Sequence, residues 1–223
     1  MLMNARILTP HDTDYPESTK RYLGLDAPQT IYLAGGGSVP PVDLAIICSV
    51  SCPGSVVIKT FDMIRDVRDA GIVVAGGFHS PMERECLHFL LRGSQQVVLC
   101  PAHGITSLTL APNEQHALDE GRLVVASIFG DDITQATPLL ACQRNDFVAS
   151  VAHTVLVPHA VPGGKAESAA RRALARGQTV LTLEDDENRS LVEHGASPVR
   201  RGEILELFRQ DVGHRSVAPG TSS

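Results

Sequence analysis

The sequence predicts an α/β domain with a mainly parallel sheet and helices on both faces. Short continuous apolar runs alternate with longer segments whose apolar residues recur at helical spacing, the pattern of strands that are buried on both sides. Aromatic residues make up only 4% of the 223 residues and Trp is absent, so Val, Leu, Ile and Ala must build the core. Such a core is typical of parallel sheets covered by helices. The length suits one large domain.

Residues 1–42 are polar and rich in turn-forming residues. One short apolar stretch, residues 31–33, is expected to form an edge strand. We interpret residues 1–42 as an extension that packs on the domain, because the segment contains a run of three glycines and five prolines: Pro10, Pro16, Pro28, Pro40 and Pro41.

A regular alternation of strands and helices occupies residues 43–197. The apolar runs predict strands at residues 44–48, 72–75, 97–100, 123–128, 154–157 and 179–183. Helical spacing, with Gly or Pro at the ends, predicts helices at residues 56–70, 81–91, 139–151, 164–176 and 188–194. This order is Rossmann-like, and such sheets bind ligands at the carboxyl ends of their strands.

Residues 198–223 are expected to form a C-terminal tail that is partly disordered. Residues 203–210 have the composition of one more helix. Residues 216–223 are small and polar, which predicts disorder.

Net charge and cysteine content indicate how the protein could bind nucleic acid and in which compartment it is expected. The net charge is −6, so nucleic-acid binding would depend on a local basic patch. The five cysteines are odd in number and follow no signal peptide, which favours reduced thiols and a cytoplasmic protein. Cys48 and Cys52 have no second pair that would complete a zinc site, so we expect no metal and no cofactor. No apolar run approaches the ~20 residues of a membrane span.

The loop after the first strand of the alternation, residues 48–54, is a candidate phosphate site. Ser49 and Ser51 are small hydroxyl residues just before a helix, where backbone N–H groups can approach an anion. The loop lacks the Gly-Lys-Ser/Thr of a P-loop and the Gly-x-Gly-x-x-Gly fingerprint. A tight strand-to-helix turn is the alternative interpretation.

The loop after the next strand combines Gly76 and Gly77 with His79 and Ser80. Backbone amides exposed here would cradle an anion, with His79 and Ser80 facing the same ligand. Glu83 follows in the first helical turn, where a carboxylate suits helix capping better than catalysis.

Gly163, Gly164 and Lys165 form a third candidate anion site between a strand and a helix. A solvated lysine on a turn is the alternative. His159 opens the same loop, and His103 follows another strand, so both are further candidates at this edge.

Arg144 and Asn145 interrupt an otherwise apolar helix. The arginine either snorkels or pairs with an acid, or it reaches over the binding edge to a phosphate. No catalytic triad is evident, so an enzyme is less expected than a binding protein.

In order and spacing these segments resemble the DNA-processing protein A (DprA, Smf) family, over about residues 8–197. In the N-terminal part, the matching motifs are Asp14-Tyr15-Pro16, Ala27-Pro28 and Ile31-Tyr32-Leu33. The matching strands are residues 44–49, 71–77 and 154–157. The other matches are the pair Arg144-Asn145 and the glycine motifs Gly163-Gly164, Gly177 and Gly195-Ala196. The resemblance implies a dimer that binds single-stranded DNA and assists a RecA-type recombinase, without enzymatic activity.

The chain also departs from the pattern of that family. Cys48 and Val50 stand where the family has the glycine and arginine of Gly-Ser-Arg, and residues 78–82 replace its Ala-Arg-Gly-Ile-Asp. Pro162-Gly163-Gly164 is similar to the motif of the related LOG phosphoribohydrolases, but Ala170 stands where their catalytic Glu belongs.

Three hypotheses therefore remain open at the level of sequence. The first is a DprA-like protein that binds single-stranded DNA. The second is a small-nucleotide-binding protein, a sensor or an enzyme of nucleotide breakdown, favoured by the three Gly/Ser loops and the histidines. The third is a structural or partner-binding subunit with a vestigial site. All three make the same structural prediction: residues 49–54, 76–81 and 162–166 lie at one edge of one sheet.

Overall fold

The computed structural model describes residues 5–215 of the chain. Nine strands form a single sheet in the order β1-β2-β6-β5-β4-β3-β7-β8-β9. The strands are Arg6–Leu8 (β1), Ile31–Ala34 (β2), Val42–Ile46 (β3), Val74–Gly76 (β4), Val97–Leu99 (β5), Leu123–Ser127 (β6), Ala152–Leu156 (β7), Thr179–Leu183 (β8) and Ser197–Val199 (β9). The seven strands from β6 to β9 in this order pair in parallel, and β2 and β1 add antiparallel pairs at one side.

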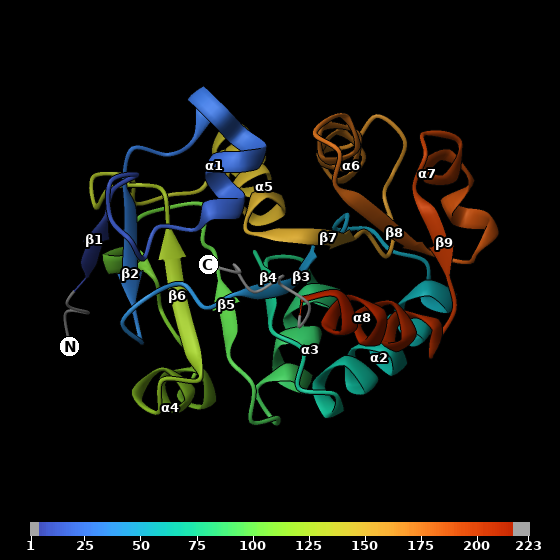
Figure 1. The fold of residues 1–223 in the computed structure, drawn as a ribbon, viewed down its shortest axis with the longest axis horizontal. Coiled ribbons are helices and arrows are strands. Elements are labelled where there is room, and N and C mark those ends of the chain that lie inside the picture. The colour runs from blue at the N-terminus through green and yellow to red at the C-terminus, as the bar shows by residue number, and fades with distance from the viewer. Residues whose placement is uncertain (1–4, 216–223) are drawn as a thin grey trace, which may run out of the picture.

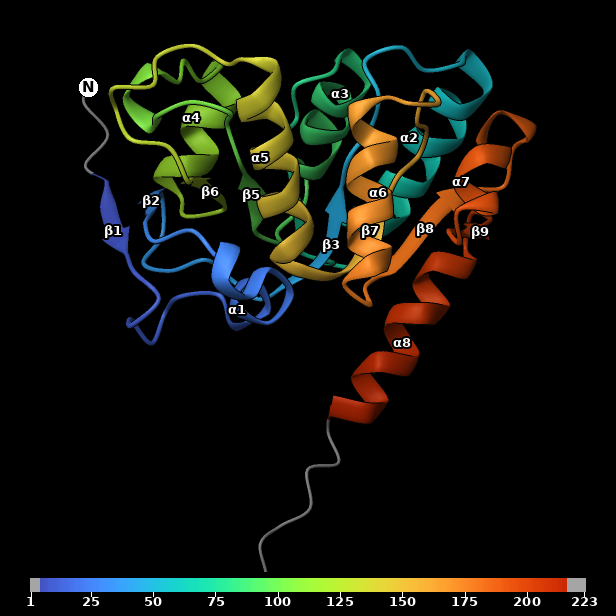
Figure 2. The same ribbon diagram turned by 90° about the horizontal axis from the view of Figure 1, so that it is seen from above.

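Helices cover both faces of this sheet (Figures 1 and 2). They are Glu17–Leu23 (α1), Gly54–Asp69 (α2), Pro81–Leu90 (α3), Pro112–Asp119 (α4), Pro138–Ser150 (α5), Lys165–Ala175 (α6), Arg189–Glu193 (α7) and Glu203–Arg215 (α8). Short 3-10 turns occupy Gly24–Asp26, Ile105–Ser107 and Asp186–Asn188. The predicted Rossmann-like α/β fold is therefore confirmed.

Alternate residues of each central strand supply two separate hydrophobic cores. Ala45 and Val155 face a core with α5 and α6, whereas Leu44 and Leu156 face a core with α2 and α3. This is the period-two alternation of a strand that is buried on both sides. The apolar runs in the sequence thus arise from two faces that are each covered by helices.

Several elements differ from the sequence prediction. Residues 31–33 do not form an edge strand, because β1 pairs with β2 outside it. Helix α4 was not predicted, although Pro112 lies in its first turn and Glu114 accepts a hydrogen bond from Ala111 N. The short helix predicted at residues 188–194 is confirmed as α7, which is one residue shorter at each end and follows a 3-10 turn at Asp186–Asn188.

The C-terminal segment adds structure beyond residue 197. Strand β9 pairs with β8, and Ile204 of α8 is fully buried against the core. The predicted helix at residues 203–210 exists and continues to Arg215. The disorder expected for residues 216–223 lies outside the described residues.

Candidate functional site

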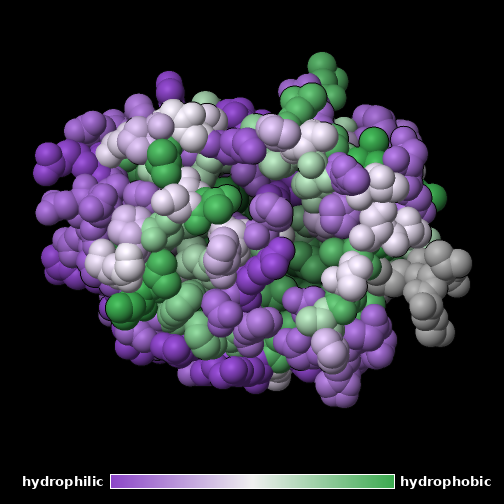
Figure 3. All heavy atoms as spheres, turned by 180° about the vertical axis from the view of Figure 1, so that it is seen from behind, coloured by the Kyte–Doolittle hydropathy of each residue, from purple (hydrophilic) through white to green (hydrophobic). Residues whose placement is uncertain are grey.

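The three predicted loops lie at the carboxyl edge of the sheet. They follow β4, β3 and β7, which are neighbours and run in parallel. Their common location is therefore confirmed. From β3 the chain moves to β4 on one side, while β7 lies on the other side. A change of direction of this kind opens a crevice where Rossmann-like proteins bind ligands. The loops gather along the top of Figure 2, and Figure 3 shows this side from outside, with hydrophobic patches between hydrophilic ones.

Ser49 joins the loops of β3 and β7. Its backbone N–H donates to His159 O at 3.1 Å, and its hydroxyl oxygen accepts from Val161 N at 2.9 Å. The hydroxyl proton is still available to a ligand, since the oxygen acts only as an acceptor in this contact. Ser51 is exposed on the same loop.

Glu83 joins the loops of β3 and β4. Its buried carboxylate accepts from Cys48 N at 3.0 Å, Ser80 N at 2.9 Å and His79 N at 3.1 Å. Ser80 Oγ in turn accepts from Glu83 N, which completes a capping box on α3. Glu83 therefore has a capping role, and the amides of His79 and Ser80 are occupied by its carboxylate instead of being open to an anion.

Gly76, the last residue of β4, and Gly77 allow close packing. A Cβ on Gly76 would lie 2.9 Å from the Phe78 ring, and Phe78 itself is buried with a positive φ of 45°. A Cβ on Gly77 would lie 1.4 Å from Arg144 Nη1. The guanidinium group of Arg144 therefore lies directly against the backbone of Gly77.

Arg144 is buried without an acidic partner. Only 6% of its surface is exposed, its Nε donates to Asn145 Oδ1 at 2.9 Å, and its Nη1 donates to Cys100 O at 3.3 Å. No carboxylate among the described residues lies within ion-pairing distance of it. Burial lowers the pKa of Arg144, and the charge of Glu83 opposes this effect. Of the interpretations from sequence, neither surface snorkelling nor pairing with an acid describes this geometry.

A buried cation without a carboxylate at ion-pairing distance is an unusual arrangement. Removing a charge from water is costly unless an opposite charge compensates for it. Arg144 reaches the ends of β4 and β5, at Gly77 and Cys100, where an anion from solvent would supply that charge.

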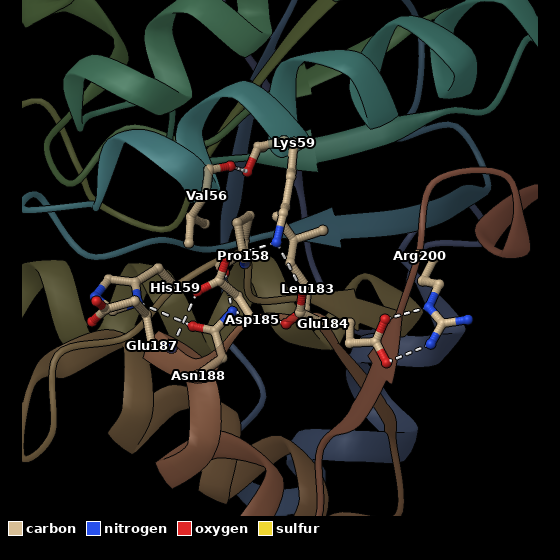
Figure 4. A network of polar contacts seen from close by, with 11 residues as sticks. Val56, Lys59, Pro158, His159, Leu183, Glu184, Asp185, Glu187, Asn188 and Arg200 are labelled. Atoms are coloured by element: carbon tan, nitrogen blue, oxygen red, sulfur yellow. Dashed lines mark hydrogen bonds and ion pairs between the residues drawn. The ribbon is translucent and has the colours of Figure 1, made fainter.

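The histidine candidates differ in exposure. His159 is buried, and its Nδ1 lies 3.0 Å from Asn188 Oδ1 (Figure 4). Asn188 also donates to the carbonyls of Pro158 and Leu183, so this cluster joins the loops of β7 and β8. His103 is half-buried with Nδ1 2.9 Å from Gly104 O, whereas His79 is exposed.

The side chain of Glu167 fixes the loop before α6 through hydrogen bonds. This buried carboxylate accepts from Gly163 N at 2.7 Å and from Ser190 Oγ at 2.5 Å. The hydrogen bond from Ser190, followed by that from Gly163, lowers the pKa of Glu167. Gly164 is the N-cap of α6, and Lys165 is exposed at its first residue.

Asn188 and the carbonyl of Cys100 are not among the residues that the sequence predicts for the site. Asn188 follows a run of four acidic residues that ends a strand, and nothing in that run distinguishes a structural asparagine from a turn residue. The role of the Cys100 carbonyl depends on its distance from Arg144, which sequence spacing does not encode.

Two clefts lie further along the same edge, at the ends of β8 and β9. Their volumes are about 530 and 320 Å³, and both are lined by Lys59 and Glu184. The charges there already have partners: Lys59 Nζ lies 2.7 Å from Asp185 Oδ2 and Arg200 pairs with Glu184 (Figure 4), and Arg201 pairs with Asp66. Paired charges leave little attraction for a further ion, so these clefts are weaker candidates than the surface around Arg144.

Two expectations from sequence concern metals and membranes. Among residues 5–215, no three His, Cys, Asp or Glu side chains gather as metal ligands would. Over the same part of the chain, every helix is too short or too polar to cross a bilayer.

The model of the family described as DNA recombination-mediator protein A matches residues 6–208. This chain belongs to that family. The family is the DNA-processing protein A family that the motifs resemble, so the resemblance drawn from the sequence is confirmed. No curated protein matches the chain by sequence.

Solved structures show the same fold. DprA from Streptococcus pneumoniae matches with a TM-score of 0.78 and 17% identity, over 92% of this chain and 75% of that one. DprA from Helicobacter pylori, whose structure is described by its single-stranded DNA binding mode, matches with a TM-score of 0.74 and 18% identity. The match covers 95% of this chain and 99% of that one. A molybdenum cofactor binding protein from Rippkaea orientalis matches less closely, with a TM-score of 0.55, 10% identity and coverage of 78% and 99%.

Proposed function

We propose that this member of the family binds single-stranded DNA along the carboxyl edge of its sheet. The observation that carries the proposal is Arg144, a buried guanidinium group that lies on Gly77 and has no carboxylate partner among the described residues. A phosphate of the DNA backbone would supply the missing charge through a charge-assisted hydrogen bond. Family membership and the described DNA binding of the Helicobacter pylori structure support this choice.

The extent of the candidate site favours single-stranded DNA over a mononucleotide as the ligand. The contacts of Arg144 lie at β4 and β5, whereas Ser49 and Lys165 lie on the loops that follow β3 and β7. These four adjacent strand ends span three spacings, about 14 Å in total. One phosphate group cannot bridge that distance, but a chain of nucleotides contacts both ends.

The remaining candidate residues either contact the DNA or hold the loops in place in this proposal. Lys165, Ser49, Ser51 and the exposed His79 are available for phosphate or sugar contacts. Exposed Val50 and Val161 add aliphatic surface for unstacked bases, since their exposed fractions are 67% and 42%. Buried Glu83, Ser80 and His159, with the backbone of Gly163, hold the loops in place.

Binding of a labelled oligonucleotide to the Arg144→Ala and Lys165→Ala variants tests the proposal. Losing one charge-assisted bond should weaken binding by about one to two decades. Lys20→Ala is the matched control, because Lys20 lies on α1, away from the carboxyl edge, and pairs with Glu17. If both site variants bind like the parent while remaining folded, the proposal is wrong. Tighter binding of mononucleotides than of oligonucleotides would instead favour the nucleotide-binding hypothesis.

We also propose a cytoplasmic homodimer that assists a RecA-type recombinase. Support comes from the recombination-mediator description of the family and from the frequency of symmetric dimers among oligomers. Light scattering should give twice the chain mass of 23.8 kDa. Faster loading of a recombinase onto oligonucleotides in the presence of this chain would support the partner, and an unchanged rate would contradict it.

A further inference from the structure

His159 is held in its loop by both its backbone and its ring. Its carbonyl oxygen accepts hydrogen bonds from Ser49 N at 3.1 Å and from Cys48 Sγ at 3.4 Å. Its ring nitrogen Nδ1 lies 3.0 Å from Asn188 Oδ1 (Figure 4), and only 6% of the residue is exposed. The imidazole therefore has a defined orientation at the carboxyl end of β7 before any ligand binds.

Asn188 determines which nitrogen of this ring carries the hydrogen. Its side-chain nitrogen Nδ2 donates to Pro158 O at 2.8 Å and to Leu183 O at 3.0 Å, and the residue is buried. Exchanging the amide nitrogen and oxygen would place an oxygen against two carbonyl oxygens, so the orientation of the amide is fixed. Asn188 Oδ1 therefore faces the ring as an acceptor, and His159 Nδ1 must be the donor. In the uncharged ring this leaves Nε2 as an acceptor.

The nitrogen Nε2 of His159 has no partner among the described residues, where the ring makes its one hydrogen bond at Nδ1. Nor is this nitrogen enclosed by protein. The buried side-chain atoms that lack a partner in residues 5–215 are Gln95 Oε1, Arg172 Nη2 and Gln178 Oε1, and Nε2 is not one of them. An acceptor atom of an almost buried ring thus contacts solvent at the candidate site.

No acid in the described part of the chain pairs with this ring. The imidazoles that lie within ion-pairing distance of a carboxylate there are those of His88, His116 and His194. An uncharged Nε2 repels the oxygens of a phosphate, because both are acceptors, and it binds an N–H donor instead. In a DNA strand the N–H donors belong to the bases.

We propose that His159 selects bases, because its Nε2 accepts a hydrogen bond from the exocyclic amino group of an unstacked base in bound single-stranded DNA. This inference rests on the proposed function and adds which part of the strand contacts the β7 loop. Cytosine N4 and adenine N6 carry N–H donors, whereas thymine has the acceptor O4. An exocyclic amino group extends beyond the base ring, so it reaches a nitrogen that is almost buried. Val161, exposed on the same loop, offers aliphatic surface to the base.

Nuclear magnetic resonance of the protein with ¹⁵N-labelled histidine tests the tautomer without DNA. The signals of His159 are those that disappear in His159→Phe. At about pH 8, where free imidazole is uncharged, we expect a hydrogen on Nδ1 and none on Nε2. That is the reverse of the tautomer that dominates for histidine in water, and Asn188→Ala should restore the usual form. A hydrogen on Nε2 in the parent protein would overturn the proposal.

Two oligonucleotides of equal length test the base contact. One contains only deoxycytidine and the other only deoxyuridine, which has the same O4 acceptor as thymidine in place of the amino group. The parent should bind the cytosine strand about fivefold more tightly, the effect of one hydrogen bond, and His159→Phe should bind both strands equally. The control His116→Phe removes an exposed imidazole on α4 that pairs with Glu120, and it should keep the preference. A preference that persists in His159→Phe would overturn the inference.

Proton uptake separates a base contact from a phosphate contact. Calorimetric titrations with the cytosine strand in two buffers of different ionisation enthalpy should show no uptake, because the uncharged ring accepts the hydrogen bond. Uptake of a proton that is lost in His159→Phe would show Nε2 donating to phosphate and would overturn the inference. If His159→Phe does not fold, the tautomer and the base preference of the parent still decide. Equal affinity of the parent for both strands overturns this inference alone, whereas no binding of either strand means that the proposed function fails as well.

Discussion

At the scale of single residues, Gly77 and Arg144 depend on each other. A methyl group on Gly77 would lie 1.4 Å from Arg144 Nη1, so Gly77→Ala must displace the guanidinium group. We expect oligonucleotide affinity to fall by about tenfold or more, because the charge-assisted bond to phosphate is lost or misaligned. Gly37→Ala is the matched control, since a Cβ there meets nothing within 4 Å. Fluorescence anisotropy measures the effect, and equal affinities for the two variants would contradict it.

Glu83 makes a second prediction at the residue scale. Its carboxylate accepts three backbone N–H groups, and Glu83→Gln leaves only one oxygen to receive them. Because an amide group would also face a donor, we expect a loss of about 1–3 kcal/mol in the free energy of unfolding. Urea denaturation checks this. The exposed Glu85→Gln, on the same helix, should change the stability far less, and a similar loss in both variants would argue against the cap.

At the scale of elements, Glu167 connects the β7 loop to α7 through Gly163 and Ser190. Hydrogen bonds to the ionised form lower the pKa of Glu167 below its ordinary value of about 4.3–4.5. The carboxylate therefore stabilises the fold fully above that ordinary value. The contribution decreases as the pH falls through the lower pKa of the folded state.

Glu167→Gln should therefore lower the stability at neutral pH and reduce its sensitivity to acid. We expect the difference in free energy of unfolding between parent and variant to shrink below about pH 4, as the Glu167 carboxylate becomes protonated. His194 Nε2 lies 3.6 Å from Glu167 Oε1, so a positive charge on that imidazole adds to the difference. Urea denaturation at several pH values measures this. Glu193→Gln changes an exposed carboxylate on α7 and should give no such profile. A difference that grows in acid would contradict the interpretation.

Sequence patterns predicted the elements whose burial is uniform. The carboxyl halves of β3 and β7 are apolar and buried, so short continuous runs revealed these strands and placed their loops at one edge. Strands β1 and β9 have only three residues each and are mostly exposed, so they carry no comparable signal. Pairing with a neighbouring strand, which is non-local, determines them.

The location of the candidate site could be predicted from the sequence, but the hydrogen-bond and ion-pair partners of its residues could not. Gly76, Gly77, Arg144 and Gly163 were identified because strand ends, glycines and a charge in an apolar helix are visible in sequence. The capping role of Glu83 is local and was predicted, but its hydrogen bond from Cys48 N depends on distances across the fold, as does the lack of an acid within ion-pairing distance of Arg144. Residues 35 or more positions apart, such as Cys48 and Glu83, meet only through the sheet order.

At the scale of the whole molecule, charge determines how binding depends on salt. The net charge of −6 repels DNA, so association relies on local cations, of which Arg144 and Lys165 are the proposed phosphate contacts. Each phosphate neutralised on a single strand contributes about −0.7 to the slope of log K against log salt. Two contacts per protomer therefore predict a slope of about −1.4.

Removing one contact should change that slope and not only the affinity. Lys165→Ala leaves one phosphate contact per protomer, so its slope should be about −0.7, half that of the parent. Lys20→Ala should keep the slope of the parent, because Lys20 is paired with Glu17 away from the carboxyl edge. Titrations of a labelled oligonucleotide at four salt concentrations measure the slopes. A parent slope several times steeper would mean that cations outside the carboxyl edge dominate binding. An unchanged slope in Lys165→Ala would remove that lysine from the DNA contact, because a side chain that neutralises a phosphate must release a counterion.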